Sequence, residues 1–476
     1  MKTYIQLVIL SHLLALLFIS CEKTTFNPNI IDPKPKPPII EDTTLTHNKF
    51  VAKWILSEME DSYLWSNKIP SVIDMTKDPE KFFKTILYEE EDRFSKIIKA
   101  DNDTINNSSE LPKTGYDYTL LSTVGSQDIY GFINFVIKGS PAESAGLKRG
   151  DLFIKINGTQ LTRSNYAELT KQTTSIHSLT MAKIDSDNNF IADKNIIISV
   201  SYFYENPILV DTMYHINGKS IGYLTYNSFD KNSSNLNIVF DKFKNENITD
   251  LVLDLRYNGG GELSSAINLA SLILGPSYEN KIFTKRTYND NLQAKLLTEY
   301  GEEYFIDRFK STVNGLPVHH LGIKKLYILI SYRTSSASEL IINGLKPYID
   351  IVLIGRNPTM GINVGSMHIA PNDYQISWQL IPVVVRISNS NDDSNYSSGF
   401  DPNIWKNEYE IRNTKELGNI HEALLSEAIF QITGVTTNTT HQPYYKTIIK
   451  PIISSKEILY PNKHRLHINP IPFSMF

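Results

Sequence analysis

The chain has 476 residues, of which 41% are apolar and 11% aromatic, so it can form two or three packed domains and is not a disordered protein. Its 47 basic and 51 acidic residues are interspersed and give a formal net charge of −4. Because this charge provides no cationic field of the kind that nucleic-acid binding needs, nucleic acid is excluded as a partner.

The amino terminus has the pattern of an export signal. Lys2 is followed by a mostly apolar run over residues 5–19, and Ser20 then precedes Cys21, the only cysteine in the chain. The run is shorter than the roughly 20 apolar residues of a convincing membrane-spanning helix, and the pattern resembles a bacterial lipobox. It predicts a signal peptide over residues 1–20 and lipidation at Cys21, with a spare thiol or an uncleaved anchor as the alternatives. The mature protein would then be lipid-anchored in the bacterial cell envelope, at the outer membrane or cell surface or on the periplasmic side.

A tether and a helical cap are expected next. Residues 21–46 are rich in proline and should be extended and semi-rigid. Residues 47–112 contain apolar positions at helical spacing over 48–66, and Asp78 and Pro79 then provide the start of a second helix. We assign this cap a role in packing only.

Residues 113–207 combine short β-like runs with one helical stretch. Gly139-Ser140-Pro141 opens the helical stretch, and Asn157-Gly158 is a strong signal for a hairpin turn. The string GSPAESAGLKRGDLFIKINGTQL resembles a PDZ domain of the circularly permuted bacterial type. That resemblance implies a loop whose backbone N–H groups bind a peptide's terminal carboxylate, and a β domain with only a structural role is the alternative. The residues expected in the loop are Tyr130, Gly131, Phe132 and Ile133.

Residues 208–434 contain a glycine-rich turn between a buried strand and a helix. The apolar run over 251–255 is typical of a parallel strand covered on both faces, and a helix is expected over 263–274. Between them, Gly259, Gly260 and Gly261 leave backbone N–H groups uncovered, which can hold an anion or an oxyanion. The spacing does not fit the G-x-G-x-x-G pattern of a dinucleotide-binding loop.

A second turn of this kind follows about seventy residues later. A strand is expected over 325–330, a tight turn over 333–339 and then a helix. A serine at such a turn has its hydroxyl beside the positive end of the helix dipole, which is a suitable place for a nucleophile. Ser335 or Ser336 acting only as a helix cap is the alternative.

The two turns together carry a family resemblance. LDLRYNGGG followed by RTSSASELI, after a PDZ-like segment and a helical cap, resembles the carboxy-terminal processing (tail-specific) serine peptidases, which use a Ser/Lys dyad. The resemblance implies a multidomain α/β protein: a helical N-terminal cap, a PDZ-like β-rich module and an α/β peptidase domain with a parallel-rich sheet. It places Ser336 at the nucleophile position and draws the oxyanion donors from Ala337 and the three glycines. It implies neither a cofactor nor a metal.

The sequence departs from the family at the general base. In the family the lysine follows a threonine-aromatic-glycine motif, and the corresponding stretch here is residues 359–366, with Ile362 in the lysine position. A buried lysine with a depressed pKa takes the serine's proton, and isoleucine cannot. Ser366 falls near the position of the polar residue that some members use to orient the lysine.

Four other residues are candidates for the general base. His368 should lie roughly 20 Å from position 362 along an extended strand, and Lys346 about 15 Å from Ser336 along a helix. Lys285 and Lys295 belong to the long insertion between residues 278 and 323, which could in principle reach the site.

Two hypotheses about function follow. The first is a serine peptidase that cuts envelope or extracellular polypeptides near their carboxyl ends, with hydrolysis impaired by Ile362. The second is a pseudopeptidase that binds peptide C-termini without cutting them. A surface lipoprotein that handles glycans or nutrients is a third class, suggested by the anchor alone. Residues 416–432 should form a closing helix, and the proline-containing extension over 435–476 has no assigned function.

Overall fold

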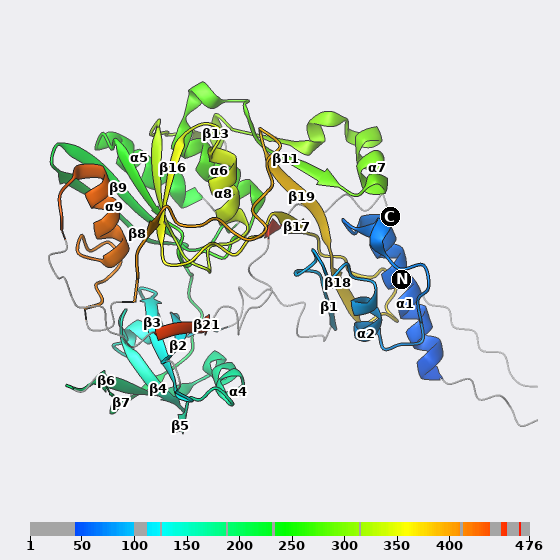
Figure 1. Ribbon diagram of the computed structural model, residues 1–476, viewed down its shortest axis with the longest axis horizontal. Coiled ribbons are helices and arrows are strands. Elements are labelled where there is room, and N and C mark those ends of the chain that lie inside the picture. The colour runs from blue at the N-terminus through cyan, green and yellow to red at the C-terminus, as the bar shows by residue number, and fades with distance from the viewer. Residues whose placement is uncertain are drawn as a thin grey trace, which may run out of the picture.

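The computed structural model describes residues 43–99, 112–123, 126–186, 189–230, 234–313, 316–409, 413–437, 449–454 and 466–467. The predicted signal peptide, Cys21 and most of the proline-rich tether lie outside these residues. Figure 1 shows an α/β body, a β-rich module below it and a group of N-terminal helices at one side. This confirms the predicted multidomain α/β fold.

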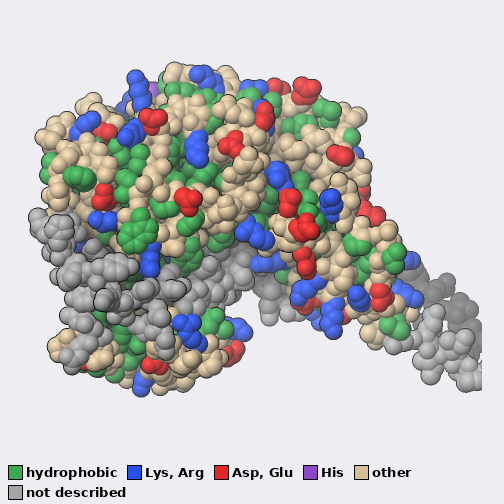
Figure 2. Space-filling model, in the orientation of Figure 1, with side chains coloured by type: hydrophobic (Ala, Val, Ile, Leu, Met, Phe, Trp, Pro, Cys, Tyr) green, Lys and Arg blue, Asp and Glu red, His purple; other side chains and the backbone are tan. Residues whose placement is uncertain are grey.

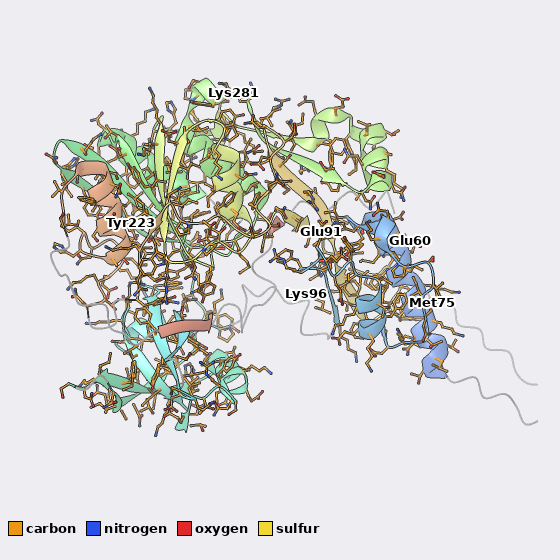
Figure 3. The ribbon with its side chains drawn as sticks, in the orientation of Figure 1. Glu60, Met75, Glu91, Lys96, Tyr223 and Lys281 are labelled. Carbon is orange, nitrogen blue, oxygen red and sulfur yellow. The ribbon has the colours of Figure 1, made fainter. Side chains whose placement is uncertain are left out.

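The N-terminal helices pack on an arm of the body. Helix α1 (Thr43–Ser62) buries Val51, Ile55 and Met59, and helix α2 (Pro79–Thr85) starts at Asp78, whose carboxylate accepts the N–H of Glu80 at 3.1 Å. Strand β1 (Lys96–Lys99) pairs antiparallel with β18 (Trp378–Ile381). Glu91, labelled in Figure 3, accepts a hydrogen bond of 2.6 Å from Arg386 of strand β19 (Val383–Asn389). The cap is thus attached to a late part of the chain.

The β-rich module is an antiparallel sheet in the order β21-β2-β3-β4-β6-β7. Its apolar core contains Phe153 and Leu179, both fully buried. Asn157 and Gly158 have φ angles of 49° and 77°, as a two-residue hairpin turn of type I′ requires. The elements are β2 (Tyr116–Thr123), β3 (Ile129–Val136), α3 (Pro141–Ser144), β4 (Leu152–Ile156), β5 (Thr159–Gln160), α4 (Tyr166–Lys171), β6 (His177–Ile184), β7 (Phe190–Ile198) and β21 (Ile449–Ser454).

The body is built on a six-stranded sheet in the order β20-β16-β15-β10-β9-β8, parallel except for the β8–β9 pair. Because successive residues of a strand point to opposite faces, Leu251 and Leu253 pack on the side of α6 and α8, whereas Val252 packs on α9. Tyr223, labelled in Figure 3, also lies on the α9 side, and its hydroxyl donates to Asp254 at 2.7 Å. The elements are β8 (Ile208–Ile216), β9 (Lys219–Tyr226), α5 (Ser234–Asn245), β10 (Asp250–Asp254), α6 (Leu263–Leu274), β15 (Lys325–Ile330), α8 (Ala337–Leu345), β16 (Asp350–Gly355), β20 (Ile404–Trp405) and α9 (Ala423–Thr433).

A second sheet, in the order β12-β11-β19-β17-β22, continues from the body toward the N-terminal helices. Helix α7 (Asp290–Tyr300) lies in the insertion and is anchored by the side-chain amide of Asn289, which donates to the carbonyl oxygens of Asp61 and Tyr63 at 3.0 and 2.9 Å. The strands are β11 (Ile282–Tyr288), β12 (Ile306–Arg308), β17 (Val364–Ser366), β19 (Val383–Asn389) and β22 (Leu466–His467), and a small hairpin is formed by β13 (Thr312–Val313) and β14 (Leu316–Pro317).

The charged side chains on the visible face of the molecule are distributed as evenly as they are along the sequence. Basic and acidic side chains are interspersed on the face shown in Figure 2. Among the described residues, none of the helices is long and apolar enough to cross a membrane. Within the same part of the chain, no cluster of three or more His, Cys, Asp or Glu residues is arranged to hold a metal ion.

Candidate active site

The glycine turn after β10 is fixed by Asn258. Its amide donates to the carbonyl oxygen of Tyr226 at 2.8 Å, and its Oδ1 accepts the N–H of Gly260 at 2.8 Å. Gly261 has a φ of 139°, and a Cβ there would lie 2.3 Å from the carbonyl oxygen of Phe229. The turn therefore needs glycine for both its backbone conformation and its close contacts.

The second turn lies directly against the first. Ser335 donates its N–H to the carbonyl oxygen of Asn258 at 3.2 Å and its hydroxyl to that of Gly259 at 2.9 Å. A Cβ at Gly260 would lie only 2.7 Å from the Cβ of Ser336. The structure thus brings together the two turns that the sequence placed about seventy residues apart.

Ser336 has the backbone and the free hydroxyl expected of a nucleophile. Its φ of 59° and ψ of −116° are unusual for a residue other than glycine, and such strain costs of order 1–3 kcal/mol. The residue is 2% exposed, and its Oγ has no hydrogen-bond partner within the part of the chain that the structure describes. Ser336 does occupy the N-cap position of α8, but the hydroxyl of Ser335 is already bonded to Gly259. The nucleophile role of Ser336 stays a prediction.

Glu339 links the serine turn to the loop that contains Ile362. One carboxylate oxygen accepts the N–H groups of Ser336 and Ile362, each at 2.8 Å, and the other accepts the N–H of Gly361 and the hydroxyl of Thr359, each at 2.6 Å. Burial raises the pKa of this fully buried carboxyl, although its hydrogen bonds act in the opposite direction. Glu339 had no predicted role. The spacing Ser336-x-x-Glu339 is that of a capping box and was the signal available for it.

Ile362, at the expected lysine position, is part of the hydrophobic core. Its side chain is 4% exposed. The four alternative bases have other partners: His368 contacts Gln379, Lys285 pairs with Asp392, Lys295 pairs with Asp61, and the ammonium of Lys346 lies 4.1 Å above the ring of Phe400. None of these contacts involves Ser336.

Among the predicted oxyanion donors, Gly260 and Ala337 lie beside Ser336, and the prediction for Gly260 needs a correction. The N–H of Gly260 already donates to Asn258, so it does not point freely into the site. The N atom of Ala337 lies 3.0 Å from the position that a Cβ of Gly260 would occupy, so it borders the glycine turn. The N–H groups of Gly259, Gly261 and Ala337 remain the predicted donors.

Buried ion pairs connect the site to the PDZ-like module. The Arg256 guanidinium donates to Glu422 at 2.6 and 3.0 Å and to Asp254 at 2.9 Å. Burial acts to raise the pKa of Glu422, but Arg256 and Arg149 hold that pKa at about 2. Arg149 belongs to the β-rich module, so Glu422 forms ion pairs with arginines from both domains.

The peptide-binding residues predicted in the PDZ-like module lie in a strand. Tyr130, Gly131, Phe132 and Ile133 belong to β3, which pairs with β2 along its length and with β4 at Gly131 and Phe132. This corrects the prediction of a loop with uncovered N–H groups, because an inner strand uses its backbone groups for the sheet. Binding of a carboxylate by these four residues stays a prediction.

Comparisons with known proteins agree with this arrangement. The sequence model of peptidase family S41 matches residues 220–402, that of the S41 N-terminal domain matches residues 51–96, and that of a PDZ domain matches residues 132–179. Residues 220–402 thus form a peptidase domain of family S41. The glycine turn, Ser336 and Ile362 all lie inside this matched segment.

Several curated relatives process carboxyl termini. The chain is 25% identical over 222 residues to the carboxy-terminal processing protease CtpA of Bacillus subtilis, a match that covers 46% of this chain and 42% of the relative. It is 24% identical over 239 residues to the chloroplastic carboxyl-terminal-processing peptidase 3 of Arabidopsis thaliana, with 47% of this chain and 41% of the relative covered. The chain therefore spans less than half the length of these relatives.

A solved structure is similar over most of both chains. A Bacteroides fragilis protein assigned to the S41 proteases is 28% identical, with a TM-score of 0.66, and the match covers 80% of this chain and 97% of that one. The similarity in fold thus extends over most of this chain and is not confined to the peptidase domain.

Proposed function

We propose that the protein is a serine-type peptidase of the carboxy-terminal processing type whose hydrolysis is slowed by the loss of its general base. The hydroxyl of Ser336, which has no hydrogen-bond partner among the described residues and belongs to a strained residue beside the glycine turn, carries this proposal. Strained backbone conformations of this kind cluster at active sites, where the surrounding structure holds them in place. The PDZ domain supports a polypeptide as the substrate.

The chemistry available at the site is incomplete. Attack of the Ser336 hydroxyl on a peptide carbonyl would develop an oxyanion, which backbone N–H groups of the glycine turn and Ala337 would stabilise. The serine proton needs an acceptor, and the side chain of Ile362 has none. Glu339 does not replace it, because its carboxylate already accepts four hydrogen bonds from other groups. Loss of a catalytic base commonly costs several orders of magnitude in rate.

Restoring the lysine tests this proposal. Ile362→Lys would place an ammonium among apolar neighbours, where desolvation lowers its pKa toward neutrality and makes it a usable base. We expect Ile362→Lys to cleave a denatured protein at least tenfold faster than the wild type and to lose that activity in the Ser336→Ala double variant. A wild type that cleaves robustly, with its activity abolished by Ser336→Ala, would instead require a base other than residue 362.

A second candidate is a pseudopeptidase that binds polypeptides without cutting them. The burial of Ile362 in the core favours it, because an apolar neighbour leaves the serine hydroxyl at ordinary reactivity. The two candidates differ in one measurement. If the wild type and Ser336→Ala both lack cleavage but bind a denatured polypeptide equally, the pseudopeptidase is favoured.

We also propose that the protein acts in the bacterial cell envelope, held by a lipid on Cys21. This rests on the lipobox-like pattern before Cys21. We expect Cys21→Ala to move the protein from the membrane fraction to the soluble fraction after signal cleavage. Retention of the cleaved variant in the membrane fraction would contradict the anchor.

A further inference from the structure

The last described segments of the chain return to the two parts of the molecule that surround the site. Strand β21 pairs antiparallel with β2 of the PDZ sheet, with Leu120 opposite Ile453. Strand β22 pairs parallel with β17, with Gly365 opposite Leu466 and Ser366 opposite His467. Figure 1 shows β21 on the lower module and β22, the short dark red strand, beside β17. One segment of chain thus adds a strand to both sheets.

The edge of β17 lies next to the loop that contains Ile362. β17 begins two residues after Ile362, and the N–H groups of Gly361 and Ile362 are bonded to Glu339, which also holds the N–H of Ser336. The other edge of β17 pairs with β19. A strand added to β17 therefore uses the edge that β22 occupies.

The edge of β2 is also tied to the serine turn. Asp117 of β2 accepts two hydrogen bonds from the guanidinium of Arg333, at 2.7 and 2.8 Å, and Arg333 precedes Ser336 by three residues. Since β2 pairs with β3 on its other side, its remaining edge is the one where β21 lies. Both edges that receive the tail thus belong to segments that contact the active-site turn.

The sequence of residues 449–467, called the tail below, suits strands that lie at sheet edges. Pro451 lies within β21, and proline in a sheet is confined to edges, where its missing N–H is tolerated. Residues 455–465 separate the two strands, and eleven residues can span up to about 36 Å when extended.

We propose that the edge of β2 opposite β3 and the edge of β17 opposite β19 form one binding surface for an extended polypeptide, and that residues 449–454 and 466–467 of this chain occupy it. The tail then competes in cis with any polypeptide that approaches Ser336. This inference rests on the proposed function only in treating the surface as the approach to the active site. Adding a strand to an exposed sheet edge is a general mode of peptide recognition.

Release of the tail tests the proposal by binding alone. The probe is a fluorescein-labelled synthetic peptide with the sequence of residues 447–470, followed by fluorescence anisotropy on the full chain. The double variant Leu466→Pro/His467→Pro should weaken β22, and Lys463→Pro, which leaves the residues of β22 unchanged, is the matched control. Because a tethered segment has an effective concentration in the mM range, we expect the double variant to bind the probe at least tenfold more tightly than the wild type and the control. Equal affinity in all three would overturn the proposal.

A disulfide provides the opposite perturbation. In a Cys21→Ser background, Ser366→Cys/His467→Cys places two cysteines at paired positions of adjacent strands, within the range that a disulfide spans. We expect the oxidised form to lose probe binding and the reduced form to recover it. Ser366→Cys without the second cysteine is the control and should bind the probe equally before and after oxidation. Unchanged probe binding after oxidation of the double-cysteine variant would contradict the proposal.

The test separates this inference from the proposed function, because probe binding needs no hydrolysis. If the tail variants bind as expected but Ile362→Lys cleaves nothing, the proposed function fails and the inference stands. If Ile362→Lys cleaves and the tail variants bind like the wild type, only the inference fails.

Discussion

Arg333 and Asp117 form a buried bidentate ion pair, with N–O distances of 2.7 and 2.8 Å, between the serine turn and strand β2. Their side chains are 1% and 4% exposed. Asp117 also accepts the side-chain amide of Asn134 at 2.6 Å. The pair therefore fixes the PDZ domain against the segment that carries Ser336.

Breaking this pair should destabilise the whole molecule. Asp117→Asn would leave the Arg333 guanidinium buried without its carboxylate, which typically costs about 3–5 kcal/mol. We expect a loss of this size in the free energy of unfolding, measured by urea denaturation. Glu80→Gln, which breaks the exposed pair with Lys84, is the control and should change stability by less than about 1 kcal/mol. Similar small effects of both variants would mean that the Arg333 pair contributes little.

Glu339→Gln should disturb the site more than its isosteric size suggests. The new amide nitrogen would face two donors, either the N–H groups of Ser336 and Ile362 or the N–H of Gly361 and the hydroxyl of Thr359. Leaving buried donors without acceptors costs about 1–3 kcal/mol each, so we expect a loss of at least about 2 kcal/mol in urea denaturation.

The control for Glu339 is a capping glutamate that faces water. Glu143 is exposed and accepts the N–H of Gly139 at 2.6 Å, so water can replace the bond that Glu143→Gln weakens. We expect a change of less than about 1 kcal/mol there. A loss at Glu339→Gln no larger than at Glu143→Gln would contradict the linking role of Glu339.

The sequence was most informative where the signal is local. An apolar run closed by glycines or a serine turn predicted the helix over 263–274 and the strand over 325–330, and both have the predicted bounds. The closing helix was expected from residue 416 but begins at Ala423, because Glu422 caps it and accepts the N–H groups of Leu424 and Leu425.

Long-range relationships were not visible in the sequence. Tyr130 to Ile133 alternate as a strand should, but nothing in one sequence shows that strands lie on both sides of them. The partners of Glu339 at Gly361 and Ile362 are likewise more than twenty residues away, and only the fold brings them together. Strand neighbours and buried polar partners therefore required the structure.

Stability should depend on pH through Glu422. Its pKa is about 2 in the folded protein, below the ordinary carboxyl value, so its contribution is present above about pH 4.5 and is lost as pH falls toward 2. The shift corresponds to a stabilisation on the order of 3 kcal/mol. We expect the difference in unfolding free energy between the wild type and Glu422→Gln to be large at pH 7 and to shrink steadily below pH 4.5. A difference that does not change between pH 7 and pH 3 would contradict the role of the Arg256 and Arg149 charges. Glu303→Gln, at an exposed partner of Arg308, should show a small difference at all pH values.

Gly260 provides a direct test of the contact between the two turns. An alanine there would have to adopt a φ of 101°, and its Cβ would lie 2.7 Å from the Cβ of Ser336 and 2.9 Å from the carbonyl oxygen of Ser335. Either Ser336 or the glycine turn must then move.

Gly158→Ala is the matched control, because its φ of 77° is also positive but its Cβ would meet nothing within 4 Å. We expect Gly158→Ala to cost about 1 kcal/mol through its backbone alone. Gly260→Ala should cost at least about 2 kcal/mol more in urea denaturation, because overpacking adds to the same backbone strain. In the Ile362→Lys background, Gly260→Ala should also abolish labelling of Ser336 by a fluorophosphonate, while Gly158→Ala should leave that labelling unchanged. Equal stability of the two alanine variants, or unchanged labelling in Gly260→Ala, would show that the glycine turn does not set the position of Ser336.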